Sequence, residues 1–331
     1  MPLLRRFGID ASEPVEKILR RTLEREAPGA RTVEPEPKRG RWLETCANSA
    51  CRTGWMQVWR NRAAPIFEGA WTCSEACMRA LISQAVVRER KGHAETRPPH
   101  RHRLPLGLLM LEQGWITAEQ LRGALESQRK HGTGRLGSWL VKQHGVKEEL
   151  VTRALAMQWS CPVLSAPAQN TAQLSMLIPR LFVDAFGVAP LRVAAGKVLY
   201  LGFEDRLDPV LARAIERMTG VRAESGVMTD SQFSQVHARM LRGQYPAVEL
   251  VEASSEETLA RVLARSVERA RPVETRLIRM HEFLWMRMIR NSPRSPAHKS
   301  AGGLAQSSLM QSSAVQSIED VQDVICTIAG Q

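Results

Sequence analysis

Several features that mark common classes of protein are missing from this chain of 331 residues. No run of eighteen apolar residues occurs, so the sequence predicts no transmembrane helix. Residues 1–8 lack the long apolar core of a secretory signal, which favours a cytoplasmic location. No Gly-x-x-x-x-Gly-Lys-Ser/Thr phosphate loop is present, and no nucleophile with a nearby base can be recognised. We therefore expect a protein that is not an enzyme and does not hydrolyse ATP.

Aromatic residues and acidic charge are both in short supply. Aromatic side chains make up 5% of the chain, although they include eight tryptophans, and the formal net charge is +12. A basic excess suggests an anionic partner, which would be a nucleic acid, a nucleotide or a lipid surface. The alternative is that the excess belongs to solvated linkers, since much of it lies in residues 88–103 and 287–299.

The most informative feature that is present is a segment repeated after thirty residues. Pro105-Leu106-Gly107 opens the first copy, which ends at Gln128. Arg135-Leu136-Gly137 opens the second copy, which ends at Gln158. A fixed internal period indicates one supersecondary unit built twice.

Each copy has the pattern of a helical hairpin. Apolar residues recur at helical spacing on both sides of a glycine stop, which is Gly114 in the first copy and Gly145 in the second. Thr117, followed by Gln120 at the third helical position, predicts a capping box. Each hairpin is too short to bury its own apolar stripe, so we expect the two to pack as a four-helix unit.

The repeated pattern of Arg-Leu-Gly, Leu-Val, a glycine turn, Ala-Leu and a final Gln resembles the MshE-type N-terminal domain, also described as GspE N-terminal-like. Such domains stand at the front of the ATPases of bacterial type II secretion and type IV pili. The resemblance covers residues 103–160 and continues over residues 162–240, where Ile178-Pro179 and the run Phe186–Leu191 resemble a second family segment. The ATPase domain itself is expected to be absent, because the chain has no phosphate loop.

The resemblance also implies a ligand and a partner. In several family members the tandem motif binds cyclic di-GMP, which is therefore the candidate ligand. The candidate partner is a component of the secretion or pilus machinery, either an inner-membrane assembly protein or an ATPase, which would hold the chain at the inner membrane. Purine bases need apolar surfaces, and phosphates need amides and cations. The candidate ligand-binding residues are Arg103, Leu106, Gly107, Leu111, Gln128, Arg135, Leu136, Gly137, Leu140 and Gln158.

Three departures from the family pattern affect this expectation. Pro105 stands where the family has Arg, His144 stands where the turn glycine belongs, and the spacer 129–134 is longer than expected. Only the second motif therefore opens with a cation, Arg135, so we expect weaker nucleotide binding than in members with both arginines. The two motif glutamines are expected to fix the backbone or to hydrogen-bond a base.

Four of the six cysteines form two pairs, Cys46 with Cys51 and Cys73 with Cys77. Two thiolate pairs brought together by a hairpin supply the tetrahedral sulfur ligands that Zn²⁺ prefers. Such a zinc would be structural, because four cysteines leave no open coordination position. The alternatives are two disulfides or four buried thiols, and a cytoplasmic location argues against disulfides.

The elements expected around the cysteines resemble a treble-clef zinc finger. We expect a turn near Asn61–Pro65 and a helix over Met78–Lys91 whose start carries the second cysteine pair. Basic residues flank the cysteines and would allow contact with nucleic acid: Arg41, Arg52, Arg60 and Arg62. No helix matches a base-reading pattern, so nucleic-acid binding is the less favoured alternative.

The remaining sequence predicts two further α/β regions. In the first we expect a strand near Pro162–Leu164, helices Thr171–Phe186, Pro209–Thr219 and Asp230–Met240, and strands Gly187–Val193, Val198–Phe203 and Arg222–Val227. In the second we expect helix Glu256–Ala270 and strands Glu274–His281, Phe283–Ile289 and Val321–Ile328, with a disordered Ser/Ala/Gln-rich loop over residues 292–317.

The fold class that we expect is α+β and multidomain, with a small zinc finger, a helical tandem-repeat bundle and small α/β sandwich domains. The expected boundaries are an N-terminal helix and linker (1–40), the finger (41–91), a basic linker (92–102), the repeat (103–160), an α/β companion domain (161–245) and a C-terminal α/β extension (254–331). The leading hypothesis is a non-catalytic binding or regulatory protein. The alternatives are a structural adaptor of secretion machinery and a zinc-dependent nucleic-acid-binding protein.

Overall fold

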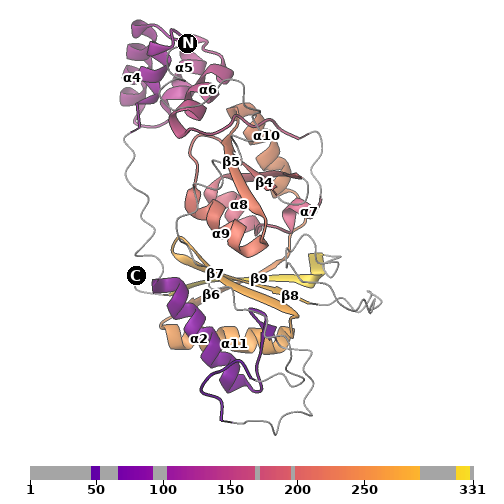
Figure 1. Cartoon of the computed structure of the whole chain (residues 1–331). Coiled ribbons are helices and arrows are strands. Elements are labelled where there is room, and N and C mark those ends of the chain that lie inside the picture. Colours follow the sequence, from indigo (N-terminus) through magenta and orange to yellow (C-terminus); the bar gives the residue numbers. More distant parts are fainter. Residues whose placement is uncertain are drawn as a thin grey trace, which may run out of the picture. The chain divides into compact units, whose positions relative to one another are not determined.

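The computed structural model describes residues 46–52, 66–91, 103–167, 172–194, 198–290 and 318–328 (Figure 1). Five of the expectations above lie outside these residues: the N-terminal helix and linker, the turn at Asn61–Pro65, the basic residues Arg41, Arg60 and Arg62, the basic linker 92–102 and the loop 292–317. Within the described residues, no helix combines the length and the apolar character needed to cross a membrane.

The repeated segment folds into four helices. They are α3 (Leu106–Glu112), α4 (Ala118–His131), α5 (Leu136–His144) and α6 (Glu148–Trp159). The predicted capping box at Thr117 is confirmed, since its side chain accepts from the Gln120 amide and the Gln120 side chain accepts from the Thr117 amide. Gly145, with φ +63°, ends α5 as expected. Gly114 also has a positive φ, in the turn that follows α3.

One apolar core is shared by all four helices, with equivalent residues of the two copies in it. Met110 and Leu140 are both fully buried, as are Ala124 and Ala154. Helix α4 packs most closely on α5, and α6 on α3, so each copy is completed by the other. This arrangement follows from hairpins that are too short to bury their own apolar faces.

The glutamine that ends each copy ties that copy to the start of the other. Gln128 Nε2 donates to the Gly134 carbonyl at 2.9 Å, and Gln158 Nε2 donates to the Leu104 carbonyl at 2.7 Å. Each carbonyl lies two residues before the first helix of the opposite copy. The expectation that these side chains fix the backbone is confirmed for both.

A three-stranded sheet follows the four helices. Its order is β3 (Val188–Ala194), β4 (Val198–Phe203), β5 (Arg222–Val227), with β3 antiparallel and β5 parallel to β4. Helix α9 (Pro209–Thr219) makes the crossover between the parallel strands, and α10 (Asp230–Leu241) follows β5. The predicted bounds of β4, β5 and α9 are confirmed.

One prediction in this region is wrong, and another is confirmed only in part. The single helix expected over Thr171–Phe186 is two helices, α7 (Ala172–Ser175) and α8 (Arg180–Phe186). Pro179 is the N-cap of α8, and proline disfavours helical backbone in the residue before it, which separates the two helices. The strand expected near Pro162–Leu164 is a single bridge between Val163 and Val227.

The C-terminal region forms a four-stranded sheet with the order β6-β9-β8-β7. The strands are β6 (Ala247–Ala253), β9 (Val321–Ile328), β8 (Phe283–Ile289) and β7 (Glu274–Met280), and α11 (Glu256–Ala270) follows β6. The predicted bounds of α11, β8 and β9 are confirmed, and β7 ends one residue earlier than expected. Strand β6 was not predicted, because its two glutamates interrupt the apolar pattern of an edge strand.

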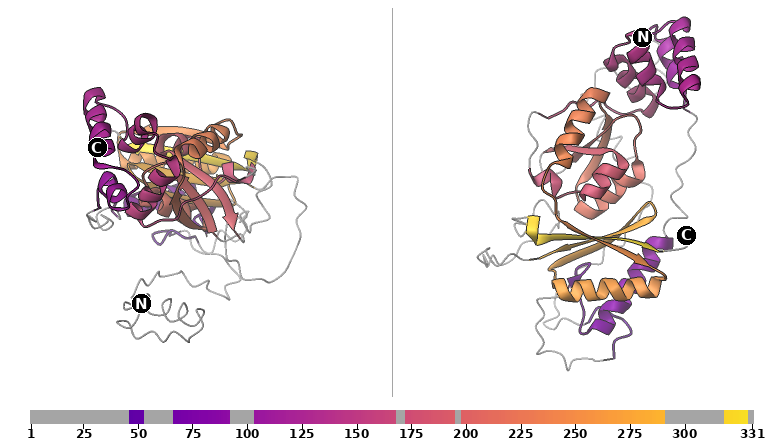
Figure 2. Two further views of the ribbon diagram at one scale, coloured as in Figure 1. Left: turned by 90° about the horizontal axis from the view of Figure 1, so that it is seen from above. Right: turned by 180° about the vertical axis from the view of Figure 1, so that it is seen from behind.

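Helix α2 (Glu75–Lys91) lies beside α11 on one face of this sheet (Figures 1 and 2). Met78, Ile82 and Val86 of α2 are fully buried there, in a core shared with α11 and with Met286 and Met288 of β8. The opposite face of the sheet, which includes Trp285, packs on the α/β region that contains β3–β5. The cysteine-bearing segment is therefore packed into the C-terminal sheet and is not an isolated finger.

Candidate functional site

The four paired cysteines meet in space. Their sulfur atoms all lie within 4.8 Å of one another, and Cys51 and Cys73 are 3.5 Å apart. Cys73 and Cys77 are 3.6 Å apart and buried, whereas Cys46 and Cys51 are half-buried. None of the four forms a disulfide.

Short local structures hold the cysteines in place. Asn48 makes a tight turn between the first pair, since its side chain accepts from the Ala50 amide at 3.1 Å. Strands β1 (Ile66–Phe67) and β2 (Ala70–Trp71) form a hairpin whose two turn residues, Glu68 and Gly69, both have positive φ. The Ala47 amide bonds to the Trp71 carbonyl, which brings the first pair to the hairpin. Helix α2 begins at Glu75, three residues earlier than predicted, so Cys77 lies in its first turn.

This geometry fits a tetrahedral metal ion with four sulfur ligands. With Zn–S bonds of about 2.3 Å, the sulfur atoms of a tetrahedral site are about 3.8 Å apart. The observed separations bracket that value. Asn48 Nδ2 also donates to the Cys77 sulfur at 3.3 Å, which is the kind of outer hydrogen bond that stabilises a thiolate ligand.

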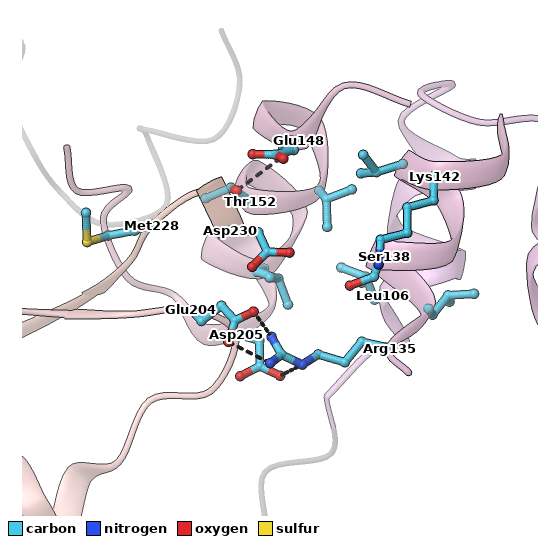
Figure 3. Close-up of a pocket in the computed structure, with 15 residues that line it drawn as sticks. Leu106, Arg135, Ser138, Lys142, Glu148, Thr152, Glu204, Asp205, Met228 and Asp230 are labelled. Atoms are coloured by element: carbon cyan, nitrogen blue, oxygen red, sulfur yellow. Dashed lines mark hydrogen bonds and ion pairs between the residues drawn. The ribbon is translucent and has the colours of Figure 1, made fainter. Parts of the chain in front are cut away.

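A pocket of about 260 Å³ lies beside α5 (Figure 3). Its apolar walls come from both copies of the repeat and from the segment after β5, and its polar rim comes from the β4–α9 loop and from α5, α6 and α10. The lining residues are Leu106, Arg135, Leu136, Gly137, Ser138, Val141, Lys142, Glu148, Val151, Thr152, Leu155, Glu204, Asp205, Met228 and Asp230.

Arg135, the N-cap residue of α5, dominates the polar rim. Its Nη1 and Nη2 atoms contact the two carboxylate oxygens of Glu204 at 2.5 and 2.6 Å, and its Nε lies 3.3 Å from Asp205 Oδ2 (Figure 3). About half of the Arg135 side chain is exposed, against 22% of Glu204. The contact joins the start of α5 to the loop that follows β4.

Acidic groups outnumber basic groups around the pocket. Lys142 accompanies Arg135, but Glu148 and Asp230 join the two carboxylates that hold Arg135. A hydrogen bond with Glu204, together with burial, raises the pKa of Asp230. Glu148 accepts from the Ser231 hydroxyl at 2.7 Å, which makes a second polar contact across the pocket.

Four of the predicted ligand residues line the pocket, namely Leu106, Arg135, Leu136 and Gly137. Leu140 is fully buried in the four-helix core, so it has no surface on which a base could stack. Gly107 packs inside the repeat, where an added Cβ would lie 2.5 Å from Leu121 Cδ1, and it is not part of the pocket lining. Leu111 packs against the same core.

The remaining candidates are engaged elsewhere. The guanidinium of Arg103 lies 3.3 Å from the centroid of the Trp159 ring, a cation–π contact away from the pocket lining. Gln128 and Gln158 hold the backbone, as described above.

Sequence reasoning missed the acidic half of the pocket. Glu204 and Asp205 follow β4, and Asp230 opens α10, so all three lie at ends of elements in a different part of the chain. In the sequence, Asp205 and Asp208 indicate only a loop that starts a helix, and Asp208 is indeed the N-cap of α9. No spacing in the sequence connects this loop to Arg135.

Part of the chain is similar in sequence to pilus-assembly ATPases. No known protein-family profile matches it. The type IV pilus assembly ATPase PilB of Myxococcus xanthus is 26% identical over 145 residues, which is 44% of this chain and 25% of that protein. The bacteriophage adsorption protein B of Escherichia coli is 35% identical over 117 residues, which is 35% of this chain and 15% of that protein.

Among solved structures, one of MshE with cdg covers 42% of this chain and 99% of its own, with 24% identity and a TM-score of 0.35. The chain spans only about a quarter of the length of the PilB that it matches, and less of the adsorption protein.

Proposed function

We propose that this protein is a non-catalytic regulatory module, related to the front domains of pilus and secretion ATPases, and that it binds a cyclic dinucleotide beside α5. Cyclic di-GMP is the leading candidate ligand, and the MshE with cdg to which part of the chain is similar adds to that choice. In this proposal the bound ligand changes how the protein interacts with a component of the secretion or pilus machinery, on the cytoplasmic side of the inner membrane.

The observation that carries the proposal is the placement of Arg135 at the mouth of an apolar pocket. Leu106, Leu136 and Leu155 offer flat apolar surface to a purine, and Arg135 and Lys142 offer cations to a phosphate. Ser138 and Thr152 are hydroxyl-bearing residues of the same lining. The pocket is smaller than the roughly 300–1,000 Å³ of typical ligand sites, so it would take one base and phosphate and leave the second half outside.

Calorimetric titration with cyclic di-GMP tests the proposal. Arg135→Ala should weaken binding by about 1.5–3 kcal/mol, the usual value of a charge-assisted hydrogen bond. Arg222→Ala removes the same charge from β5, outside the pocket lining, and should leave binding unchanged. Pro105→Arg should tighten binding, because it gives the first motif the cation that Arg135 gives the second. Pro105 is the N-cap of α3 and has an extended backbone that arginine adopts without strain.

If the wild type and Pro105→Arg both show no heat at high ligand concentration, the nucleotide proposal fails. The adaptor function would then be preferred, and one observation already favours it. Leu104 and Leu108, at the start of the first copy of the repeat, are about half exposed. Their equivalents in the second copy are the small residues Gly134 and Ser138. A protein partner that docks on the first copy would explain this difference.

We also propose that the four cysteines bind one structural Zn²⁺. The sulfur separations and the hydrogen bond from Asn48 to Cys77 support this assignment. A closed set of four thiolates offers no position for a catalytic water, which agrees with a binding role for the chain.

A further inference from the structure

The contact between Arg135 and Glu204 uses the part of the guanidinium that phosphate recognition needs. Arginine has five N–H donors, and its two terminal nitrogens form the fork that takes a carboxylate or a phosphate in bidentate fashion. Both terminal nitrogens of Arg135 contact Glu204, at 2.5 and 2.6 Å, and Nε contacts Asp205. An anionic ligand therefore meets a guanidinium whose fork is already occupied.

No equivalent arginine opens the first copy of the repeat. Pro105 occupies that position, and Arg103 lies over the Trp159 ring outside the pocket lining. Lys142, the other cation of the lining, lies at the far end of α5 and carries a single ammonium group. A ligand phosphate and the Glu204 carboxylate thus need the same guanidinium fork.

The carboxylates come from a different part of the fold than the arginine does. Glu204 and Asp205 lie on the loop between β4 and α9, whereas Arg135 begins α5. The hydrogen bonds from Ser231 to Glu148 would remain, but they join α10 to α6 and do not involve the β4–α9 loop. Loss of the Arg135–Glu204 pair would therefore loosen the β4–α9 loop from the four-helix unit.

We infer that Glu204 is an internal competitor for the anionic ligand. The ligand binds Arg135 only by displacing the Glu204 carboxylate, so binding is coupled to release of the β4–α9 loop from α5. This inference rests on the proposed function. It adds that Glu204 limits the affinity for the ligand and that release of the β4–α9 loop accompanies binding. The Glu204 carboxylate occupies the Arg135 guanidinium until an anion that binds more strongly replaces it.

Three matched carboxylate-to-amide variants test the competition by calorimetric titration with cyclic di-GMP. Glu204→Gln should tighten binding by about tenfold, the value of one charge-assisted hydrogen bond in an equilibrium constant. Asp205→Asn should tighten it less, because Asp205 contributes one contact at 3.3 Å. Glu224→Gln makes the same chemical change on β5, where Glu224 pairs with Arg222, and should match the wild type.

The outcomes separate this inference from the proposed function. If the wild type and Glu204→Gln bind with equal affinity, competition is overturned while nucleotide binding stands. If neither binds, both ideas are overturned. Hydrogen exchange of the wild type adds an independent readout, because cyclic di-GMP should speed exchange in residues 204–207. Slower exchange there on binding would contradict displacement, and Asp205→Asn carries the test if Glu204→Gln does not fold.

Discussion

At the scale of single residues, one ion pair holds the turn between β7 and β8 to the start of α9. His281 Nε2 lies 2.6 Å from Asp208 Oδ2, and the imidazole ring stacks on Phe186. Asp208 Oδ1 also accepts from the amides of Val210 and Leu211, so this carboxylate caps α9 as well. The hydrogen bond with Asp208 raises the pKa of His281. Burial would raise the pKa of Asp208, but His281 and the two amides hold it below its usual value.

These shifts give a pH window. The raised pKa of His281 adds stability that is complete below its unfolded value of about 6.5 and is lost as pH rises through the folded value. The lowered pKa of Asp208 adds stability above about 3.9 that is lost as pH falls through the folded value. The pair should therefore stabilise the fold most between about pH 4 and 6.5.

A double-mutant cycle measures this dependence. His281→Asn removes the charge and suits the positive φ of residue 281, and Asp208→Asn keeps the helix cap. The coupling free energy, from denaturant unfolding, should be about 1 kcal/mol at pH 5.5 and much smaller well above the folded pKa of His281. A coupling that is equally large at pH 5.5 and pH 9 would contradict the assignment.

At the scale of elements, the glycines of the two repeat motifs set how closely the helices approach. A Cβ on Gly107 would lie 2.5 Å from Leu121 Cδ1, and one on Gly137 would lie 2.6 Å from Val151 Cγ1. The two positions are equivalent in the repeat, but the neighbouring side chains differ in stiffness. Leucine can move its terminal methyl by rotating χ2, whereas the branched carbon of valine is fixed by χ1.

Alanine substitutions at these glycines should therefore differ. Gly137→Ala should destabilise the fold by about 1–3 kcal/mol through overpacking. The higher helix propensity of alanine should offset up to about 1 kcal/mol of that loss. Gly107→Ala should cost less, because Leu121 can adjust. Urea unfolding of the two variants in parallel provides the comparison. A larger loss for Gly107→Ala would show that side-chain stiffness does not control the interface.

At the scale of the whole molecule, the cysteine-bearing segment is stabilised in two ways. The four cysteines bring together sulfur atoms suited to hold a metal ion, and α2 packs on the C-terminal sheet through Met78, Ile82 and Val86. Glu89, near the end of α2, is buried. Its carboxylate accepts hydrogen bonds from both terminal nitrogens of Arg217 on α9, at 2.7 and 3.0 Å. Metal is therefore expected to order residues 46–52 and 66–73, whereas burial keeps α2 folded.

Zinc analysis and chelation test this division. Elemental analysis should find about one zinc per chain in protein purified without chelators. Cys73→Ser should reduce the zinc content, whereas Cys161→Ser, outside the cluster, should not. After chelation, hydrogen exchange should rise in residues 46–52 and 66–73 while α2 stays protected, and the unfolding temperature should fall. Absence of metal from the purified wild type would refute the zinc assignment, and loss of protection in α2 would refute its independent anchoring.

What the sequence determined by itself is local in origin. Periodicity and end signals predicted α9, α11, β4, β5, β8 and β9 with the bounds that the structure has, because turn and capping chemistry acts over a few residues. The thirty-residue repeat likewise predicted helix positions and the roles of Gln128 and Gln158. The paired cysteines predicted the ligand cluster, since few arrangements bring two close pairs together.

Tertiary structure decided the features that depend on distant segments. Helix α2 belongs with the C-terminal sheet because Met78, Ile82 and Val86 bury their apolar surface against strands about 200 residues away in the sequence. The acidic rim of the pocket depends on the β4–α9 loop meeting α5, a contact that no spacing encodes. Leu140 shows the same limit, because helical spacing assigns a face to a residue but cannot tell a core from a binding surface.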